Sequence, residues 1–163
     1  MRIKVYHGST DKVENPICAF GRKNLDFGQG FYVTDIREQA VKWATLTALK
    51  KNGSPIINCY LLDKDALMKD AKCKTFEAYN AEWLEFIVAS RKGLNPAANY
   101  DYIEGGIAND RVIDTVNLYI SGLMSSDIAL KRLAMHQPNN QICLLNQSMT
   151  DKYLEYVGTE SAE

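Results

Sequence analysis

The chain has 163 residues, of which 46% are hydrophobic and 10% aromatic, enough for one domain with its own core. Nineteen lysines and arginines nearly balance twenty aspartates and glutamates, so no global charge attracts nucleic acid or membranes. No apolar stretch reaches the ~20 residues that span a bilayer, and no signal-type segment opens the sequence. We therefore expect one cytoplasmic domain over 1–158, a flexible tail over 159–163 and no membrane partner.

The cysteines predict reduced thiols and no metal site. Zinc sites are built from closely spaced Cys and His ligands, whereas this chain has no C-x-x-C pair and only two histidines. Two of its four cysteines, Cys59 and Cys143, lie in apolar runs, where a cysteine behaves as a small buried hydrophobe.

Hydrophobic periodicity and turn residues divide the first half of the chain into short elements. Asp35 and Glu38 have the spacing of a capping box at the start of a helix, and Asn52-Gly53 is a stop signal at its end. In chain order we expect a strand over 2–6, a loop over 11–30, a strand over 31–34, a helix over 36–51, a central strand over 56–62 and a short helix over 64–70.

The second half has the same mixture, with glycines and prolines between its elements. In chain order we expect a helix over 76–92, a strand over 102–108, helices over 111–121 and 126–136, and strands over 141–145 and 153–157. Five or six strands split by helices predict the α+β class.

Two motifs near the start of the chain supply chemistry suited to a nucleotide. Tyr6-His7-Gly8-Ser9 ends the first strand, and the segment from Asp26 to Tyr32, Asp-Phe-Gly-Gln-Gly-Phe-Tyr, enters the second. A histidine offers a hydrogen-bonding edge, glycines leave the backbone open to close approach, and an aromatic ring stacks on a flat heterocycle. A nicotinamide ring and its ribose require these three kinds of group. No Rossmann or Walker glycine motif is present.

The order of these motifs resembles the ADP-ribosyltransferase superfamily, in the branch of diphtheria toxin and the poly(ADP-ribose) polymerases, which carries a His-Tyr-Glu signature. Trp43 follows Tyr32 by eleven residues, and a late strand opens with Gln141. The chain is more similar still to a family of small uncharacterised bacterial domains assigned to that superfamily, over most of residues 5–145. The resemblance implies an ADP-ribosyltransferase-like split β-sheet core with flanking helices.

The resemblance also implies a role for each site residue, with NAD as co-substrate. His7 would bind a ribose hydroxyl, and the backbone of Gly8 would hold the nicotinamide carboxamide. Tyr32 and Trp43 would stack on the two faces of the nicotinamide ring. The expected cofactor-binding residues are His7, Gly8, Ser9, Gly30, Tyr32 and Trp43, and the expected catalytic residues are His7, Tyr32 and Gln141.

The third motif departs from the signature. In active members of the branch, a glutamate near the start of a late strand binds the ribose 2′-hydroxyl and stabilises the positive charge that develops as the glycosidic bond breaks. Gln141 is the matching residue here, and an amide makes the hydrogen bond without supplying the charge. Three alternatives follow: slow turnover, help from another acid such as Glu104 or Asp110, or no turnover.

The function expected from this resemblance is mono-ADP-ribosyl transfer from NAD to a macromolecule, as in a bacterial toxin held by an antitoxin protein. The near-neutral charge favours a protein acceptor over a nucleic acid. Alternatives are an NAD glycohydrolase, a transferase acting on RNA or a phosphorylated nucleic-acid end, and a non-catalytic NAD-binding or protein-interaction module.

Overall fold

The structure, a computed structural model, describes residues 1–108, 112–136 and 139–163. Within these ranges it has two β-sheets and six α-helices, so the fold is α+β. The elements in chain order are β1 (Arg2–Ser9), η1 (Cys18–Phe20), β2 (Phe31–Val33), α1 (Arg37–Lys51), β3 (Ile56–Asp63), α2 (Lys64–Asp70), β4 (Cys73–Thr75), α3 (Ala81–Arg91), η2 (Pro96–Asn99), β5 (Tyr102–Gly105), α4 (Ile113–Ile120), α5 (Ser126–Leu133), β6 (Gln141–Leu144), α6 (Gln147–Tyr153) and β7 (Leu154–Ser161).

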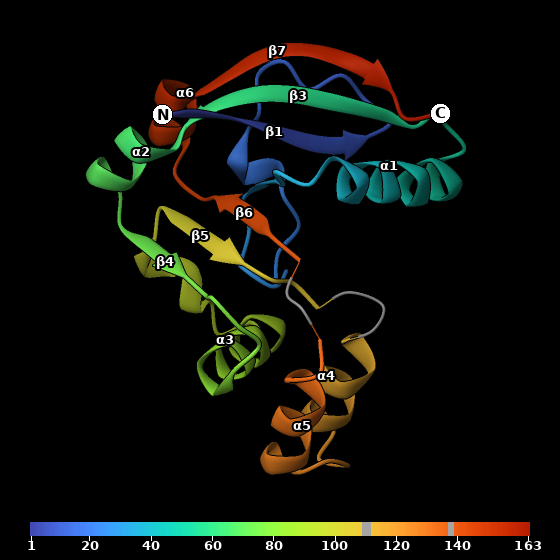
Figure 1. The fold of residues 1–163 in the computed structure, drawn as a ribbon, viewed down its shortest axis with the longest axis vertical. Coiled ribbons are helices and arrows are strands. Elements are labelled where there is room, and N and C mark those ends of the chain that lie inside the picture. Colours follow the sequence, from blue (N-terminus) through green and yellow to red (C-terminus); the bar gives the residue numbers. More distant parts are fainter. Residues whose placement is uncertain (109–111, 137–138) are drawn as a thin grey trace.

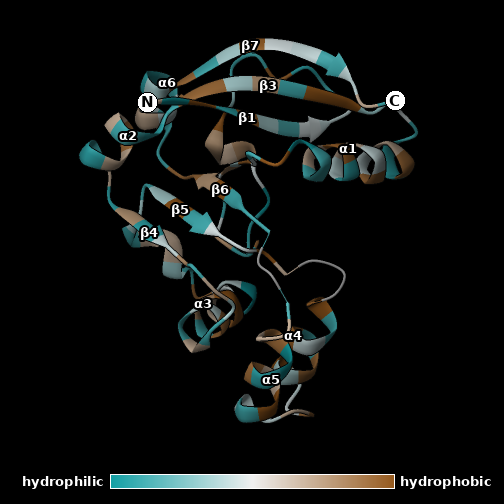
Figure 2. Ribbon diagram, viewed as in Figure 1, coloured by the Kyte–Doolittle hydropathy of each residue, from teal (hydrophilic) through white to brown (hydrophobic). Residues whose placement is uncertain are grey.

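The first sheet has three antiparallel strands in the order β1-β3-β7 and lies at the top of Figure 1. Strand β3 is central and mostly hydrophobic (Figure 2), as the sequence predicted. Strand β1 pairs with it along its whole length, from Arg2 opposite Asp63 to Ser9 opposite Ile56. His7 therefore lies within the strand and not beyond its end.

The C-terminal strand is longer than expected. β7 pairs with β3 as far as Ser161, and the amide of Ala162 donates to the carbonyl of Pro55 at 3.1 Å. The expected flexible tail over 159–163 is therefore wrong for residues 159–162. Its predicted start followed Gly158, but the register between the strands shifts beside this glycine, and such a bulge lets a strand continue past it.

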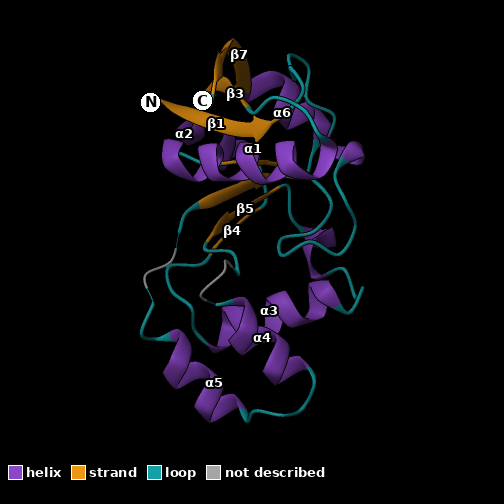
Figure 3. Ribbon diagram, turned by 90° about the vertical axis from the view of Figure 1, so that its right-hand side faces the viewer, coloured by secondary structure: helices purple, strands orange, loops and turns teal. Residues whose placement is uncertain are grey.

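The second sheet has the order β2-β6-β5-β4, in which only β4 pairs in parallel with its neighbour. It lies beneath the first sheet in Figures 1 and 3. The sheets are joined by a bridge, in which the amides and carbonyls of Tyr6 and Thr34 exchange hydrogen bonds of 2.8 and 2.9 Å. A core between the sheets packs Val5, Tyr60 and Leu62 of the first against Phe31, Ile142 and Leu144 of the second.

Helices α1 and α3 begin later than the sequence predicted. Helix α1 starts at Arg37, and no side chain caps it, so the predicted capping box is wrong. Asp35 instead accepts a hydrogen bond from Asn140 Nδ2 at 3.1 Å. Helix α3 starts at Ala81 because the side chain of Asn80 caps it. The predicted end of α1 is confirmed, since Asn52 adopts the left-handed conformation at its C-cap.

Helix α3 lies below the second sheet, and α4 and α5 lie further from it (Figure 3). Residues of the three helices form a second core around Trp83 and Ile87, together with Ile103 and Cys143 of the sheet. The second sheet thus contributes residues to two cores, one shared with these helices and one shared with the first sheet. Within the described ranges, no helix is both long and apolar enough to cross a membrane. Beyond the Tyr6–Thr34 bridge, the edge between β1 and β2 is open, and the predicted motif residues meet there.

Candidate functional site

A pocket of about 680 Å³ lies where β1, β2, α1 and the start of β6 meet, within the range of roughly 300–1,000 Å³ typical of ligand sites. We call it the motif pocket. It brings together five of the residues that the sequence singled out, and Gly8 and Ser9 are not among its lining residues. The five are His7, Gly30, Tyr32, Trp43 and Gln141.

The side chain of His7 is held in one orientation. Its Nδ1 lies 2.8 Å from the carbonyl oxygen of Tyr32, and its ring centroid lies 4.4 Å from that of Phe31. A carbonyl oxygen only accepts, so Nδ1 carries the proton and Nε2 is left as an acceptor. Burial lowers the pKa of His7 below its ordinary value of 6.5, and the bond to Tyr32 opposes this shift. A neutral imidazole with a free acceptor suits a ligand hydroxyl.

The backbone of Gly8 faces the open edge of β1. Opposite residues of antiparallel strands alternate between bonded and non-bonded pairs. Because Tyr6 bonds to Thr34, the N–H and C=O of Gly8, two residues on, also point away from β3. A Cβ on Gly8 would lie 2.0 Å from the carbonyl oxygen of Ala40 in α1. Close packing of the helix therefore requires this glycine, a reason that the sequence did not suggest.

Ser9 turns the chain after β1. Its hydroxyl accepts a hydrogen bond from the amide of Asp11 at 3.1 Å. The expected contact of Ser9 with a ligand therefore competes with a local structural role.

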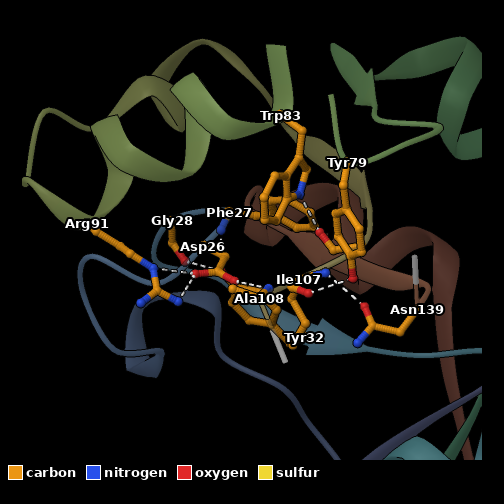
Figure 4. Close-up of polar contacts among 11 residues, drawn as sticks. Asp26, Phe27, Gly28, Tyr32, Tyr79, Trp83, Arg91, Ile107, Ala108 and Asn139 are labelled. Carbon is orange, nitrogen blue, oxygen red and sulfur yellow. Dashed lines mark hydrogen bonds and ion pairs between the residues drawn. The ribbon is translucent and has the colours of Figure 1, made fainter. Parts of the chain in front are cut away.

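The hydroxyl of Tyr32 anchors the glycine-rich loop, as Figure 4 shows. It donates to the carbonyl of Gly28 at 2.6 Å and accepts from the amide of Phe27 at 3.0 Å. Burial raises the pKa of this phenol, so it stays protonated. Its ring lines the motif pocket. Gly30 also packs closely, since a Cβ there would lie 2.6 Å from the carbonyl oxygen of Leu144.

Trp43 approaches the pocket from α1. Leu46, Thr47 and Lys50 line the pocket as well, and this spacing of three, four and seven residues places all four on one face of the helix. Trp43 is half-buried. The spacing of these four residues therefore indicates that Trp43 reaches the motif pocket from one face of α1.

Gln141 lines the motif pocket and has an unsatisfied polar atom. It is the first residue of β6 and is 1% exposed. Its Nε2 has no hydrogen-bond partner among the described residues, although a buried donor without a partner costs about 1–3 kcal/mol. A ligand acceptor in the pocket would offset this cost.

Glu104 lies on the other face of the sheet. Gln141 is opposite Gly105 in the ladder, and successive residues alternate between faces. The carboxylate of Glu104 accepts from Tyr102 Oη at 2.6 Å, from Lys64 Nζ at 2.9 Å and from Asn140 Nδ2 at 3.0 Å. This placement disfavours the alternative in which Glu104 assists Gln141. The other expected acid, Asp110, lies outside the described residues.

The carboxylate that does line the motif pocket is Asp26. Its Oδ1 accepts from Nε and Nη2 of Arg91 at 3.0 and 2.8 Å, and its Oδ2 accepts from the amide of Ala108 at 2.8 Å (Figure 4). Asp26 belongs to the glycine motif, but its partners are far away in the sequence. No local pattern therefore pointed to this ion pair.

The chain segment after β5 forms a further wall of the motif pocket, through Ile107 and Ala108. Trp83 Nε1 donates to the carbonyl of Gly106 at 2.7 Å, and Tyr79 Oη donates to that of Ile107 at 2.9 Å. The amide of Ile107 donates to Asn139 Oδ1 at 2.8 Å. Figure 4 shows these contacts on both sides of the segment. They fix its backbone against helix α3 and the start of β6.

The outer part of the motif pocket is cationic and apolar. Arg22 and Lys50 are exposed and line it. Ile17, Phe20 and Leu46 also line it, with exposed fractions of 44%, 82% and 46%. Cations pair with phosphate, and an exposed aromatic ring stacks on a base. Hydrogen-bonding groups lie deep in the pocket, so the whole suits a sugar, a phosphate and an aromatic ring together.

Comparison with known proteins shows the family of this chain. Residues 3–156 match the family DUF3990, described as a protein of unknown function, and the chain belongs to this family. No curated protein and no solved structure matches the chain.

Proposed function

We propose that this member of the DUF3990 family is an NAD-dependent mono-ADP-ribosyltransferase whose NAD site is the motif pocket. One observation carries the proposal: His7, Tyr32 and Gln141, from three different strands, line one pocket, and Nε2 of Gln141 has no hydrogen-bond partner within the described part of the chain. The two facing sheets, with a pocket lined by residues of both, are compatible with the split β-sheet core that the sequence resemblance implies.

The groups deep in the pocket fit the nicotinamide end of NAD. A ribose hydroxyl both donates and accepts, so it can donate to His7 Nε2 and accept from Gln141 Nε2. Gly8 follows His7 and lies outside the lining residues, and its outward N–H and C=O match the two hydrogen-bonding groups of a carboxamide. Tyr32 and Trp43 supply aromatic faces for the nicotinamide ring.

The outer groups fit the other end of the molecule. Arg22 and Lys50 would hold the two phosphates, because guanidinium and ammonium groups donate charge-assisted hydrogen bonds to phosphate oxygens. Phe20, 82% exposed, would lie against the adenine.

In the transfer, the bond between ribose and nicotinamide breaks, and its electron pair leaves with nicotinamide. The acceptor's nucleophile bonds to the same ribose carbon and loses its proton. Positive charge builds on the ribose, and Gln141 stabilises it only as a dipole. Asp26 supplies little charge, since Arg91 neutralises it. Because neither Gln141 nor Asp26 supplies a net negative charge, we expect slow turnover.

We propose a protein acceptor, because the exposed apolar side chains at the pocket mouth (Ile17, Phe20 and Leu46) suit a protein surface better than a nucleic-acid backbone. An antitoxin protein covering this mouth in the cytoplasm would block both NAD and acceptor. The amide of Gln141 and the neutralised Asp26 favour one second candidate, a non-catalytic NAD-binding module.

Release of nicotinamide from labelled NAD tests the proposal. The native chain should release it, and Gln141→Leu should lower both the release and the stabilisation by NAD. Gln39→Leu, on α1 outside the pocket, is the matched control and should behave as the native chain. Binding of NAD without any release would assign the second candidate, and the absence of both binding and release would refute both.

A further inference from the structure

A second pocket, of about 420 Å³, lies behind the glycine loop. Gly28 and Gln29 line this pocket, whereas Asp26 and Gly30 of the same loop line the motif pocket. In the same way, Ser90 of helix α3 faces the second pocket, and its neighbour Arg91 faces the first. The loop and the end of α3 thus form a wall between two cavities. We call the second cavity the Ser90 pocket.

Ser90 is buried without a partner. It is 2% exposed, and its hydroxyl has no hydrogen-bond partner among the residues that the structure describes. A serine inside a helix often bonds to the carbonyl of the preceding turn, and this one does not. An unpaired buried hydroxyl is unfavourable, yet this one borders a cavity large enough for a ligand. A polar group of a ligand would satisfy it.

The remaining walls are polar but nearly uncharged. Asn24 and Asn95 line the pocket, and both hold left-handed backbone conformations, with φ of 61° and 51°. Their amides donate and accept alike. Tyr100 adds a half-buried aromatic ring, and Lys23, exposed at the surface, is the one charged side chain among the described lining residues. Most ligand sites are lined mainly by apolar groups, so this lining indicates an unusually polar ligand.

We propose that the Ser90 pocket binds a neutral, hydroxyl-rich ligand of the size of a monosaccharide. Hydroxyl groups both donate and accept, as do Ser90 Oγ and the amides of Asn24 and Asn95. The apolar face of a sugar ring packs against an aromatic side chain, here Tyr100. The absence of carboxylates among the described lining residues disfavours a cationic ligand. This site is separate from the proposed NAD site.

Titration of the full ¹⁵N-labelled chain with D-glucose, D-ribose and N-acetyl-D-glucosamine, followed by NMR, tests the proposal. At least one sugar should cause saturable shifts of the backbone amides of Asn24, Ser90 and Asn95, and leave those of Trp43 and Gln141 unchanged. If none of the three sugars gives saturable shifts, the proposal is wrong. It is equally wrong if the shifts concentrate at Trp43 and Gln141. Since no NAD is involved, this result is independent of the proposed function.

Three variants sharpen the test. Ser90→Ala should weaken the best sugar by about five- to tenfold, the loss of one hydrogen bond, and raise the melting temperature of the free protein, because the unpaired hydroxyl is gone. Ala98→Phe adds bulk from an exposed lining residue and should abolish binding. Asn99→Phe, its exposed neighbour outside the lining, should retain it. Equal sugar affinity in all three variants would overturn the assignment.

Discussion

Nδ1 of His7 and the carbonyl oxygen of Tyr32 lie 2.8 Å apart, and this contact joins the two sheets beyond their backbone bridge. It links the first motif to the second through a side chain. Because the carbonyl only accepts, the contact also decides which imidazole nitrogen faces the pocket as an acceptor. The same histidine therefore joins the two sheets and, in the proposed function, binds the ligand.

The pH dependence of stability should reveal His7. Burial lowers the pKa of His7 below 6.5 in the folded state. At pH values below about 6.5, His7 is therefore protonated more in the unfolded chain than in the folded chain. The contribution of His7 is then complete above about pH 6.5 and declines as the pH falls towards the folded pKa. Urea unfolding at several pH values between 8 and 5 gives the free energy of unfolding as a function of pH. This free energy should fall less steeply with decreasing pH in His7→Gln than in the native chain.

His136→Gln, which changes the other histidine, is the matched control for this experiment. A slope that is unchanged in His7→Gln, or that falls equally in both variants, would contradict the assignment.

Tyr32→Phe should loosen the glycine loop. The hydroxyl makes two buried hydrogen bonds, to Gly28 and Phe27, and its removal leaves both backbone groups without this partner. We expect a loss of about 1–3 kcal/mol in the free energy of unfolding, measured by urea denaturation. The ring remains, so NAD should still stabilise the variant. Tyr6→Phe is the comparison, and an equal loss in both would argue against the anchoring role.

Gln141→Glu should raise nicotinamide release by about tenfold, which corresponds to about 1.4 kcal/mol in the barrier. A carboxylate stabilises the developing positive charge more than an amide dipole does. The dissociation constant for NAD should change little, because the ground-state hydrogen bond is available to both side chains. Single-turnover release and equilibrium binding separate the two quantities. An active enzyme in which Gln141→Glu changes neither would show that the third motif was misplaced.

The Asp26–Arg91 pair should contribute to stability more than a surface ion pair. Both side chains are mostly buried, with side-chain exposures of 10% for Asp26 and 27% for Arg91. Asp26→Asn or Arg91→Met therefore leaves the remaining charged side chain with little water to replace its lost partner. We expect losses of roughly 2–4 kcal/mol, reduced from fully buried cases by partial exposure. A double-mutant cycle by urea denaturation should show coupling between the two positions.

The exposed pair Lys12–Glu14 provides the control for this cycle, with an expected loss under about 1 kcal/mol in Glu14→Gln. Additive effects of Asp26→Asn and Arg91→Met would mean that the pair does not act as a unit.

Local sequence patterns determined several elements correctly. The β-branched run over 56–62 predicted the central strand β3, because a strand buried on both faces needs a continuous hydrophobic run. Asn52 predicted the end of α1, since its side chain tolerates the left-handed conformation. The segment 64–70 predicted α2 with the same bounds. The motif residues His7, Tyr32 and Gln141 were also named from the sequence, and the structure brings them to one pocket.

Only the tertiary structure decided how these pieces meet. The partner of Asp26 lies 65 residues away, and no local pattern specifies such a pair. Pairing with β3, which no pattern within 154–163 reveals, extends β7 to Ser161. Glu104 and Gln141 are both polar residues in strands, but the ladder register sets them on opposite faces. Periodicity identifies strands and helices from neighbouring residues, whereas register and long-range contacts depend on how the sheets pack.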